Sequence, residues 1–361
     1  MISDATLAQA VRDELISAAQ ADGLRALEAQ TAASAAPAWA AAPTPDDESL
    51  RLVSGFGDVF VAIGLALFFG AAGFFVQHFF GRLAMWLAVA VLAWLLAEFF
   101  TRRRRMALPS IILLVVFAGC VFIALLQILT GSDLFASNNI IGVAKGGGED
   151  RPIWLAGVAT AGAAALHYWR FRVPITIAAG AAALAAAFVA FGLSLSLQPS
   201  RGLVSALVLV CGLAIFSLAM AFDGSDRERA TRRTDIAFWL HLLAAPMIVH
   251  PVISTFVNDT SGVETGGAIA ILVVFLVFAL VAVAIDRRAM LVSGLVYAGV
   301  AFGSLLRQTG LSDMNIPATL LALGVFVLLL SAGWQPLRRA ILRFFPSPLA
   351  RRLPHPVRNP S

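Results

Sequence analysis

Residues 235–257 read DIAFWLHLLAAPMIVHPVISTFV, a stretch that is long enough to cross a bilayer. The stretch is mostly apolar, yet it contains two histidines, His241 and His250, and two prolines, Pro246 and Pro251. Ionisable residues inside a membrane-spanning segment are rare, and they are functional candidates by default. If the protein has a site inside the membrane, we expect that site on this helix.

The composition of the whole chain also indicates a membrane protein. Of the 361 residues, 60% are hydrophobic and only 13% are charged, whereas a soluble domain carries about 25% charged residues. The apolar runs predict ten spanning helices, at about 57–77, 83–100, 108–129, 153–169, 174–197, 202–222, 235–257, 267–285, 289–306 and 317–333. We therefore predict an all-α, polytopic transmembrane helix bundle that lies in a lipid bilayer.

The distribution of basic residues predicts the orientation of this bundle. If the N-terminus lies in the cytoplasm, eighteen of the basic residues after the first span fall on the cytoplasmic side and five fall on the opposite side. Because positive charges accumulate in cytoplasmic loops, both termini are expected to be cytoplasmic. The same residues lie at helix ends and not along one phosphate-binding face, so we expect no nucleic-acid partner.

Four segments make up the predicted domain organisation. The bundle occupies residues 51–335, and an Arg/Pro-rich cytoplasmic tail follows at 336–361. A short amphipathic N-terminal helical preface at 1–31, with a capping box at 17–20, is joined to the bundle by an Ala/Pro linker at 32–50. The preface is either a docking module for a protein partner or a lead-in that lies against the first membrane helix, since helices this short are marginal alone.

Six residues are candidates for a pathway or a ligand site in the membrane: His241, Pro246, His250, His167, His78 and Glu98. His241 and His250 are nine residues apart, about 13.5 Å along an ideal helix and on opposite faces, so each needs partners from other helices. By depth, His241 pairs with His167 and His250 with His78. The carbonyls that the prolines free must be satisfied inside the protein, so we expect the backbone at Pro246 to face the interior.

Two interpretations of the histidines stay open. They form a proton relay, a haem or metal ligand set or a substrate contact, or they hydrogen-bond to carbonyls that the prolines open. Glu98 is interpreted as a helix-end ion pair with an arginine one turn away, and Asp286 beside Arg287 and Arg288 repeats this arrangement.

Sequence signatures of known chemistry are missing from the chain. We find no Walker A sequence, GxSxG, HExxH or CxxC, and Cys120 and Cys211 lie within apolar segments as packing residues. We therefore expect no catalytic residue, no metal site and no cofactor. An intramembrane enzyme or a haem protein is the less favoured class.

Four stretches resemble a known group of proteins: ELISAAQADGLRALEAQ at 14–30, FGDVFVAIGLAL at 56–67, AEFFTRRRRMALPS at 97–110 and FWLHLLAAPMIVHP at 238–251. They resemble uncharacterised bacterial multi-pass inner-membrane proteins, described as predicted membrane proteins of unknown function. The resemblance implies a bacterial inner (plasma) membrane, and it carries over no catalytic or ligand residue.

Two functions follow as expectations. The first is transport or permeation of a small solute or a proton, with the seventh helix lining the pathway. The alternative is a structural or accessory membrane protein that binds a partner through residues 1–31 or the cytoplasmic hairpins. Transport predicts that polar faces of several helices converge on Pro246, whereas an accessory role predicts a dry interior packed with Ala and Gly. Neither a substrate nor an oligomeric state follows from the sequence.

Overall fold

A computed structural model of the full chain describes residues 4–13, 15–24, 56–131, 153–196, 200–226, 231–256, 265–308 and 314–343. Within these ranges all regular secondary structure is helical, so the predicted all-α class is confirmed for them. The chain divides into two units. The first contains α1 (Asp4–Arg12) and the helical residues 18–24, and the second contains all helices from α3 to α13.

The predicted capping box is formed in the first unit. The backbone N–H of Ser17 donates to the Gln20 side-chain oxygen at 2.9 Å, and the N–H of Gln20 donates to the Ser17 hydroxyl at 3.2 Å. This reciprocal pair satisfies two donors that a helix start leaves open. The expected linker at 32–50, the last part of the preface and residues 344–361 of the tail lie outside the described residues.

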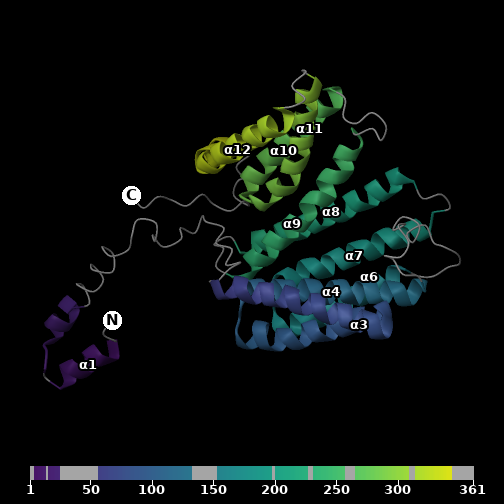
Figure 1. Cartoon of the computed structure of the whole chain (residues 1–361). Coiled ribbons are helices and arrows are strands. Elements are labelled where there is room, and N and C mark those ends of the chain that lie inside the picture. Colours follow the sequence, from purple (N-terminus) through teal and green to yellow (C-terminus); the bar gives the residue numbers. More distant parts are fainter. Residues whose placement is uncertain are drawn as a thin grey trace. The chain divides into compact units, whose positions relative to one another are not determined.

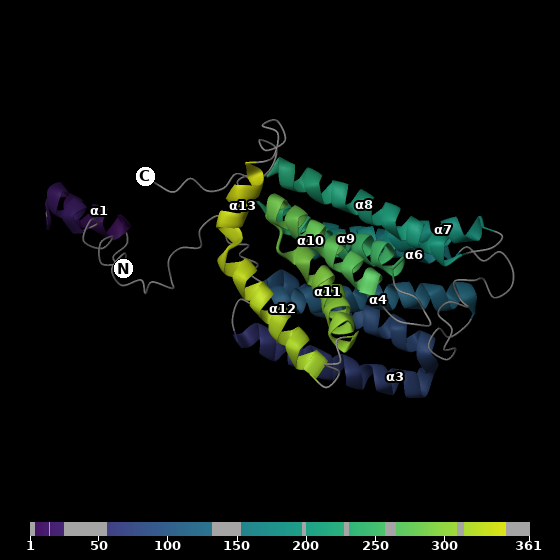
Figure 2. The same ribbon diagram turned by 90° about the horizontal axis from the view of Figure 1, so that it is seen from above.

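The second unit is a stack of long helices: α3 (Phe56–Ala97), the π-helix η2 (Glu98–Arg103), α4 (Ala107–Thr130), α6 (Trp154–Phe171), α7 (Ile175–Ser194), α8 (Arg201–Ser225), α9 (Arg232–Ser254), α10 (Thr265–Ile285), α11 (Ala289–Gln308), α12 (Asn315–Ala332) and α13 (Trp334–Leu342). Figures 1 and 2 show α3 and α4 on one side of this unit and α10, α11 and α12 on the other. Between them, α9 packs against α7, α8 and α11.

Seven of the described helices are long and apolar enough to cross a membrane: α3, α4, α7, α8, α9, α10 and α11. The bent pair of α12 and α13 would make an eighth. The predicted count of ten is not confirmed. The segments predicted at 57–77 and 83–100 lie in α3, which η2 continues, and α6 has only 18 residues and carries His167, Tyr168 and Arg170 among its last five. The described helices fit a multi-pass membrane protein.

The helix α3 folds back on itself at Gly81. This residue has φ 83° and ψ 175°, a backbone conformation that is essentially restricted to glycine. A straight helix would hold Gly73 and Val89 about 24 Å apart. Yet a Cβ placed on Gly73 would lie 3.7 Å from the Met85 side chain and 3.9 Å from Val89. The two segments expected from the sequence are therefore two arms of one bent helix that pack against each other.

Close helix packing is visible where α6 meets α7. A Cβ added at Gly157 would lie 2.6 Å from the carbonyl oxygen of Ala183 and 2.8 Å from the nitrogen and Cβ of Ala187. Without a hydrophobic driving force between helices in lipid, small residues that let backbones approach supply much of the packing energy. Gly157 and the alanines of α7 are such residues.

We predict that Gly157→Ala destabilises the protein by about 1–3 kcal/mol, because the new methyl group collides with the backbone of α7. The matched control is Gly162→Ala in the same helix, where an added Cβ meets nothing within 4 Å. This control should be neutral or stabilising, since alanine favours a helix over glycine. Thermal unfolding of the purified protein in detergent measures both. Equal melting temperatures for the two variants would show that α6 and α7 do not pack as described.

Candidate functional site

The helix α9 is the most deeply embedded of the seven candidate spans. In the most apolar stretch of 18 residues in α9, 56% is buried inside the protein, against 44% or less in the corresponding stretches of the other six spans. The helix begins after Thr231, whose hydroxyl accepts a hydrogen bond from the N–H of Arg233. Ala237, His241 and Ala245 recur every four residues and all have an exposed fraction of 0%. These residues define the inward face of α9, where His241 lies between two small side chains.

Three ionisable side chains meet at this face. His241 Nε2 lies 2.9 Å from Oδ2 of Asp223, which belongs to the last turn of α8. Arg287, from the connection between α10 and α11, donates from Nε to the same oxygen at 3.1 Å and from Nη2 to Asp223 Oδ1. The guanidinium thus holds the carboxylate with two parallel N–H groups, a strong and directional form of ion pair. All three side chains are at least 96% shielded from solvent.

A left-handed turn brings Arg287 into the bundle. The helix α10 ends at Ile285, and Asp286 follows with φ 60°. The N–H of Arg287 then donates to the carbonyl of Ala282 at 2.9 Å, which satisfies one of the carbonyls at the end of α10. The turn directs Asp286 and Arg287 to different neighbours, although they are adjacent in the sequence.

The chemistry of this cluster follows from its burial. A single charge in an apolar interior costs several kcal/mol, so Asp223 and Arg287 compensate each other only while their geometry is kept. His241 adds an imidazole whose Nε2 contacts the same carboxylate and can donate or accept a hydrogen bond there. The arrangement can therefore hold a proton between an imidazole and a carboxylate, with an arginine that always stays charged beside them.

A second ionic group lies next to the first along the chain. Trp334 Nε1–H donates to Asp286 Oδ1 at 2.7 Å, and Arg338 Nη1 lies 3.6 Å from Asp286 Oδ2. The guanidinium of Arg288 lies over the Trp334 ring, 5.1 Å from its centroid. The left-handed turn sends Arg287 inward to Asp223, and the carboxylate of Asp286 contacts Trp334 and Arg338 of α13. These contacts tie α13, which is bent by 69° from α12, to the end of α10.

His167 lies in an aromatic environment away from this cluster. Its ring centroid is 5.7 Å from that of Trp94, 5.6 Å from Phe117 and 4.6 Å from Phe171, and its Nδ1 lies 3.4 Å from the Thr176 hydroxyl. These neighbours come from α3, α4, α6 and α7, and the expected pairing with the histidine of α9 is not among them. The surroundings of His167 are those of a packed core residue.

The predicted pairing of His250 with His78 is not among the contacts of these residues, and Pro246 lies on the outward side of α9. His250 hydrogen-bonds to the Tyr297 hydroxyl of α11, whereas His78 stacks on Phe74 of its own helix, with ring centroids 6.2 Å apart. Pro246 is exposed, as is His250 one turn later, so the proline ring lies on the outward side of α9. Small alanines occupy the inward face because they let neighbouring helices approach, which leaves the proline ring outside.

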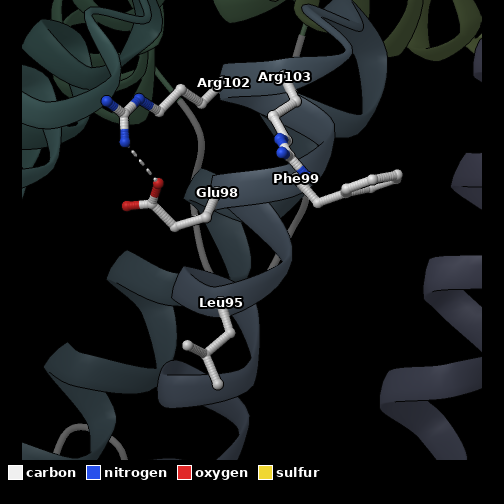
Figure 3. A pocket seen from close by; sticks show the side chains of 5 residues that line it. All are labelled: Leu95, Glu98, Phe99, Arg102 and Arg103. Atoms are coloured by element: carbon white, nitrogen blue, oxygen red, sulfur yellow. Dashed lines mark hydrogen bonds and ion pairs between the residues drawn. The ribbon is translucent and has the colours of Figure 1, made fainter.

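Glu98 forms the predicted ion pair at the helix end. Its carboxylate lies 3.3 Å from Arg102 Nη1, one turn away (Figure 3). Arg170, from the last turn of α6, binds the same carboxylate with Nε at 2.7 Å and Nη2 at 2.8 Å. The pair with Arg102 follows from helical spacing. The stronger, bidentate pair with Arg170 bridges 72 residues, so helical spacing could not predict it. This pair joins the ends of α3 and α6 on one side of the unit.

Comparison with protein-family models, with curated proteins and with solved structures finds no match to this chain. Within the described ranges, no three His, Cys, Asp or Glu side chains lie close enough together to hold a metal ion. Fold and site define an all-α protein with helices long and apolar enough to span a membrane and a buried Asp–His–Arg cluster. Nothing about its activity is carried over from a relative.

The sequence identified only one of the three residues of this cluster. His241 stood out as an ionisable group inside an apolar segment, whereas Asp223 lies one residue past the predicted span at 202–222 and Arg287 was assigned to its neighbour Asp286. The available signal was an acidic residue at the end of a span. Helical periodicity alone does not favour Asp223 over Asp226 or Asp235 as a site residue. The contact that selects Asp223 is with Arg287, which lies 64 residues away in the sequence.

We predict that Asp223→Asn destabilises the protein by about 3–5 kcal/mol, because it leaves the Arg287 charge buried without its counter-charge. The matched control is Glu98→Gln, which removes a carboxylate with an exposed fraction of 31% and should cost about 0–1 kcal/mol. The double variant Asp223→Asn, Arg287→Met should lose less than Asp223→Asn alone, since no buried charge remains. Thermal unfolding in detergent measures all three. Similar losses for Asp223→Asn and Glu98→Gln would contradict the buried ion pair.

Proposed function

We propose that this protein is a membrane-embedded transport or permeation protein for a small solute or a proton, with α9 lining the pathway. The observation that carries the proposal is the Asp223–His241–Arg287 cluster, which lies between candidate membrane spans. Ionisable groups inside a bilayer are costly, and they concentrate at proton relays and at ion and substrate pathways. A polar cluster on the most embedded helix is where such a pathway would bind its cargo or its coupling proton.

In this proposal His241 and Asp223 share the mobile proton. A proton on the imidazole gives the cluster a cation on each side of the carboxylate, whereas its release leaves Asp223 paired with Arg287 alone. The two states differ by one charge at a buried position. A helix bundle with two arrangements would respond to that charge, since burying an uncompensated charge costs several kcal/mol.

We also propose ten membrane passes with both termini in the cytoplasm of a bacterial cell. The arginine asymmetry supports this orientation. The reversal of α3 at Gly81 supports two passes in that helix, and the bidentate pair of Glu98 with Arg170 supports a common side for the ends of α3 and α6. The ends of α8 and α10 share a side in the same way, through Asp223 and Arg287.

The second candidate is a structural or accessory membrane protein, and the packing of the second half of α9 favours it. There Val249 and Ile253 pack against Ala268, Ile271 and Ala301, all of them apolar and buried. The Asp223–His241–Arg287 cluster therefore lies before Pro246, whereas the buried cluster after Pro246 is apolar and the polar contact there is the exposed pair of His250 with Tyr297. An accessory protein would keep this interior dry, and deletion of residues 1–31 would abolish binding of its partner.

Water access to the inward face of α9 tests the transport proposal. In a background with Cys120→Ala and Cys211→Ala, we place single cysteines at Ala237 and Ala245, one turn before and one turn after His241. We predict that a small polar thiol reagent labels both in intact membranes, because a transport pathway opens to water in at least one of its states. The control is Ala93→Cys, equally small and 0% exposed, in an apolar cluster of α3 and α4.

Protection of both α9 cysteines, with Ala93→Cys protected as well, would mean a dry core around His241. The transport proposal would then fail and the accessory role would stand. Labelling of the Ala93 position would instead show that the reagent enters packed apolar regions, and a bulkier polar reagent would replace it.

A further inference from the structure

We propose that the π-helix η2 carries a binding site for the headgroup of an anionic phospholipid. An open depression of about 370 Å³ lies on this helix, lined by Leu95, Glu98, Phe99, Arg102 and Arg103. Figure 3 shows these side chains in order along the helix, with Leu95 at one end and the two arginines at the other. This site lies on α3 and η2, apart from the Asp223–His241–Arg287 cluster of α8, α9 and the α10–α11 connection, and it does not depend on transport.

The backbone of this segment is widened at the depression. The N–H of Arg104 donates to the carbonyl of Phe99, five residues earlier, at 3.0 Å. Such π-turns are rare and are frequent at functional sites, because they redirect side chains that a regular α-helix would align differently. Here the widened turn places Phe99 and Arg103 beside each other, next to Glu98 and Arg102 (Figure 3).

The charges of the depression fit a phosphate group. Glu98 is already bound by Arg102 and by the bidentate guanidinium of Arg170. The Arg103 side chain is exposed, and within the described ranges it has no hydrogen-bond or ion-pair partner. The two arginines of the depression therefore carry more positive charge than its single carboxylate neutralises. A guanidinium can bind two phosphate oxygens through two of its N–H groups.

The apolar part of the depression selects a lipid over a free anion. Leu95 is 58% exposed and Phe99 41% exposed, directly beside the arginines. Both belong to a helix that is long and apolar enough to span the membrane, and the arginines follow where its apolar sequence ends. A phospholipid has the same order of parts, since its phosphate lies at the membrane surface and its acyl chains run inward. Basic sites at this depth are typical places for anionic headgroups.

The test uses the full-length chain, purified in a neutral detergent and titrated with phosphatidylglycerol or phosphatidylcholine, with bound lipid counted by native mass spectrometry. We expect one phosphatidylglycerol to be retained in preference to phosphatidylcholine. Arg103→Gln should weaken its binding about fivefold, the loss expected for one arginine at a membrane surface. Arg103→Lys keeps the charge without the planar fork and should lose less. The matched control is Arg233→Gln at the start of α9, an exposed arginine outside the depression, which should bind as the unchanged protein does.

Three outcomes would overturn the proposal. Equal losses for Arg103→Gln and Arg233→Gln would mean general attraction of anionic lipid to basic surfaces. Equal retention of phosphatidylcholine would mean an apolar contact without headgroup recognition. Displacement of phosphatidylglycerol by millimolar inorganic phosphate would mean a site for a free anion. Because Arg103 is exposed, its variants are expected to fold, and their melting temperatures in phosphatidylcholine check this.

Discussion

The ion pair between Asp223 and Arg287 constrains the second half of the bundle more than any other single contact described here. A guanidinium with an exposed fraction of 1% must be neutralised where it lies, and Asp223 does this with both of its oxygens. Because the partners come from the end of α8 and the connection after α10, the pair fixes two helices that are far apart in the sequence. His241 then places α9 against the same carboxylate.

This constraint has a consequence for motion. The ends of α8, α10 and α13 are joined by buried ionic contacts, through Arg287 to Asp223 and through Asp286 to Trp334 and Arg338. The opposite half of α9 packs through apolar side chains such as Val249 and Ile253 and makes one hydrogen bond to α11, from His250 to the Tyr297 hydroxyl. Apolar contacts slide at little cost, whereas separating Asp223 from Arg287 exposes two uncompensated charges to a low-dielectric interior. Any rearrangement that separates α8 from α10 would therefore break this buried ion pair.

The features that could be predicted from the sequence are those that local chemistry decides. The capping box at Ser17 and Gln20 and the pair of Glu98 with Arg102 depend on spacings of three and four residues. The span predicted at 235–257 and the observed α9, Arg232–Ser254, differ by three residues at each end, because the apolar run is long. The pairs that build the site bridge 18 and 64 residues, and their register depends on which helices pack together. The exposed position of Pro246 could not be predicted for the same reason, since rotation of a helix about its axis is set by its neighbours.

The near absence of lysine is understandable from these contacts. The chain has 26 basic residues, and Lys145 is its only lysine. At Glu98 and at Asp223 the cation uses two N–H groups of one planar guanidinium, from Arg170 and Arg287 respectively, an arrangement that a single ammonium group cannot reproduce. An arginine also stays charged when it is buried, whereas a lysine in the same place would lose its proton more readily. In the cluster, the permanent cation of Arg287 lies beside the Asp223 carboxylate, which also contacts His241.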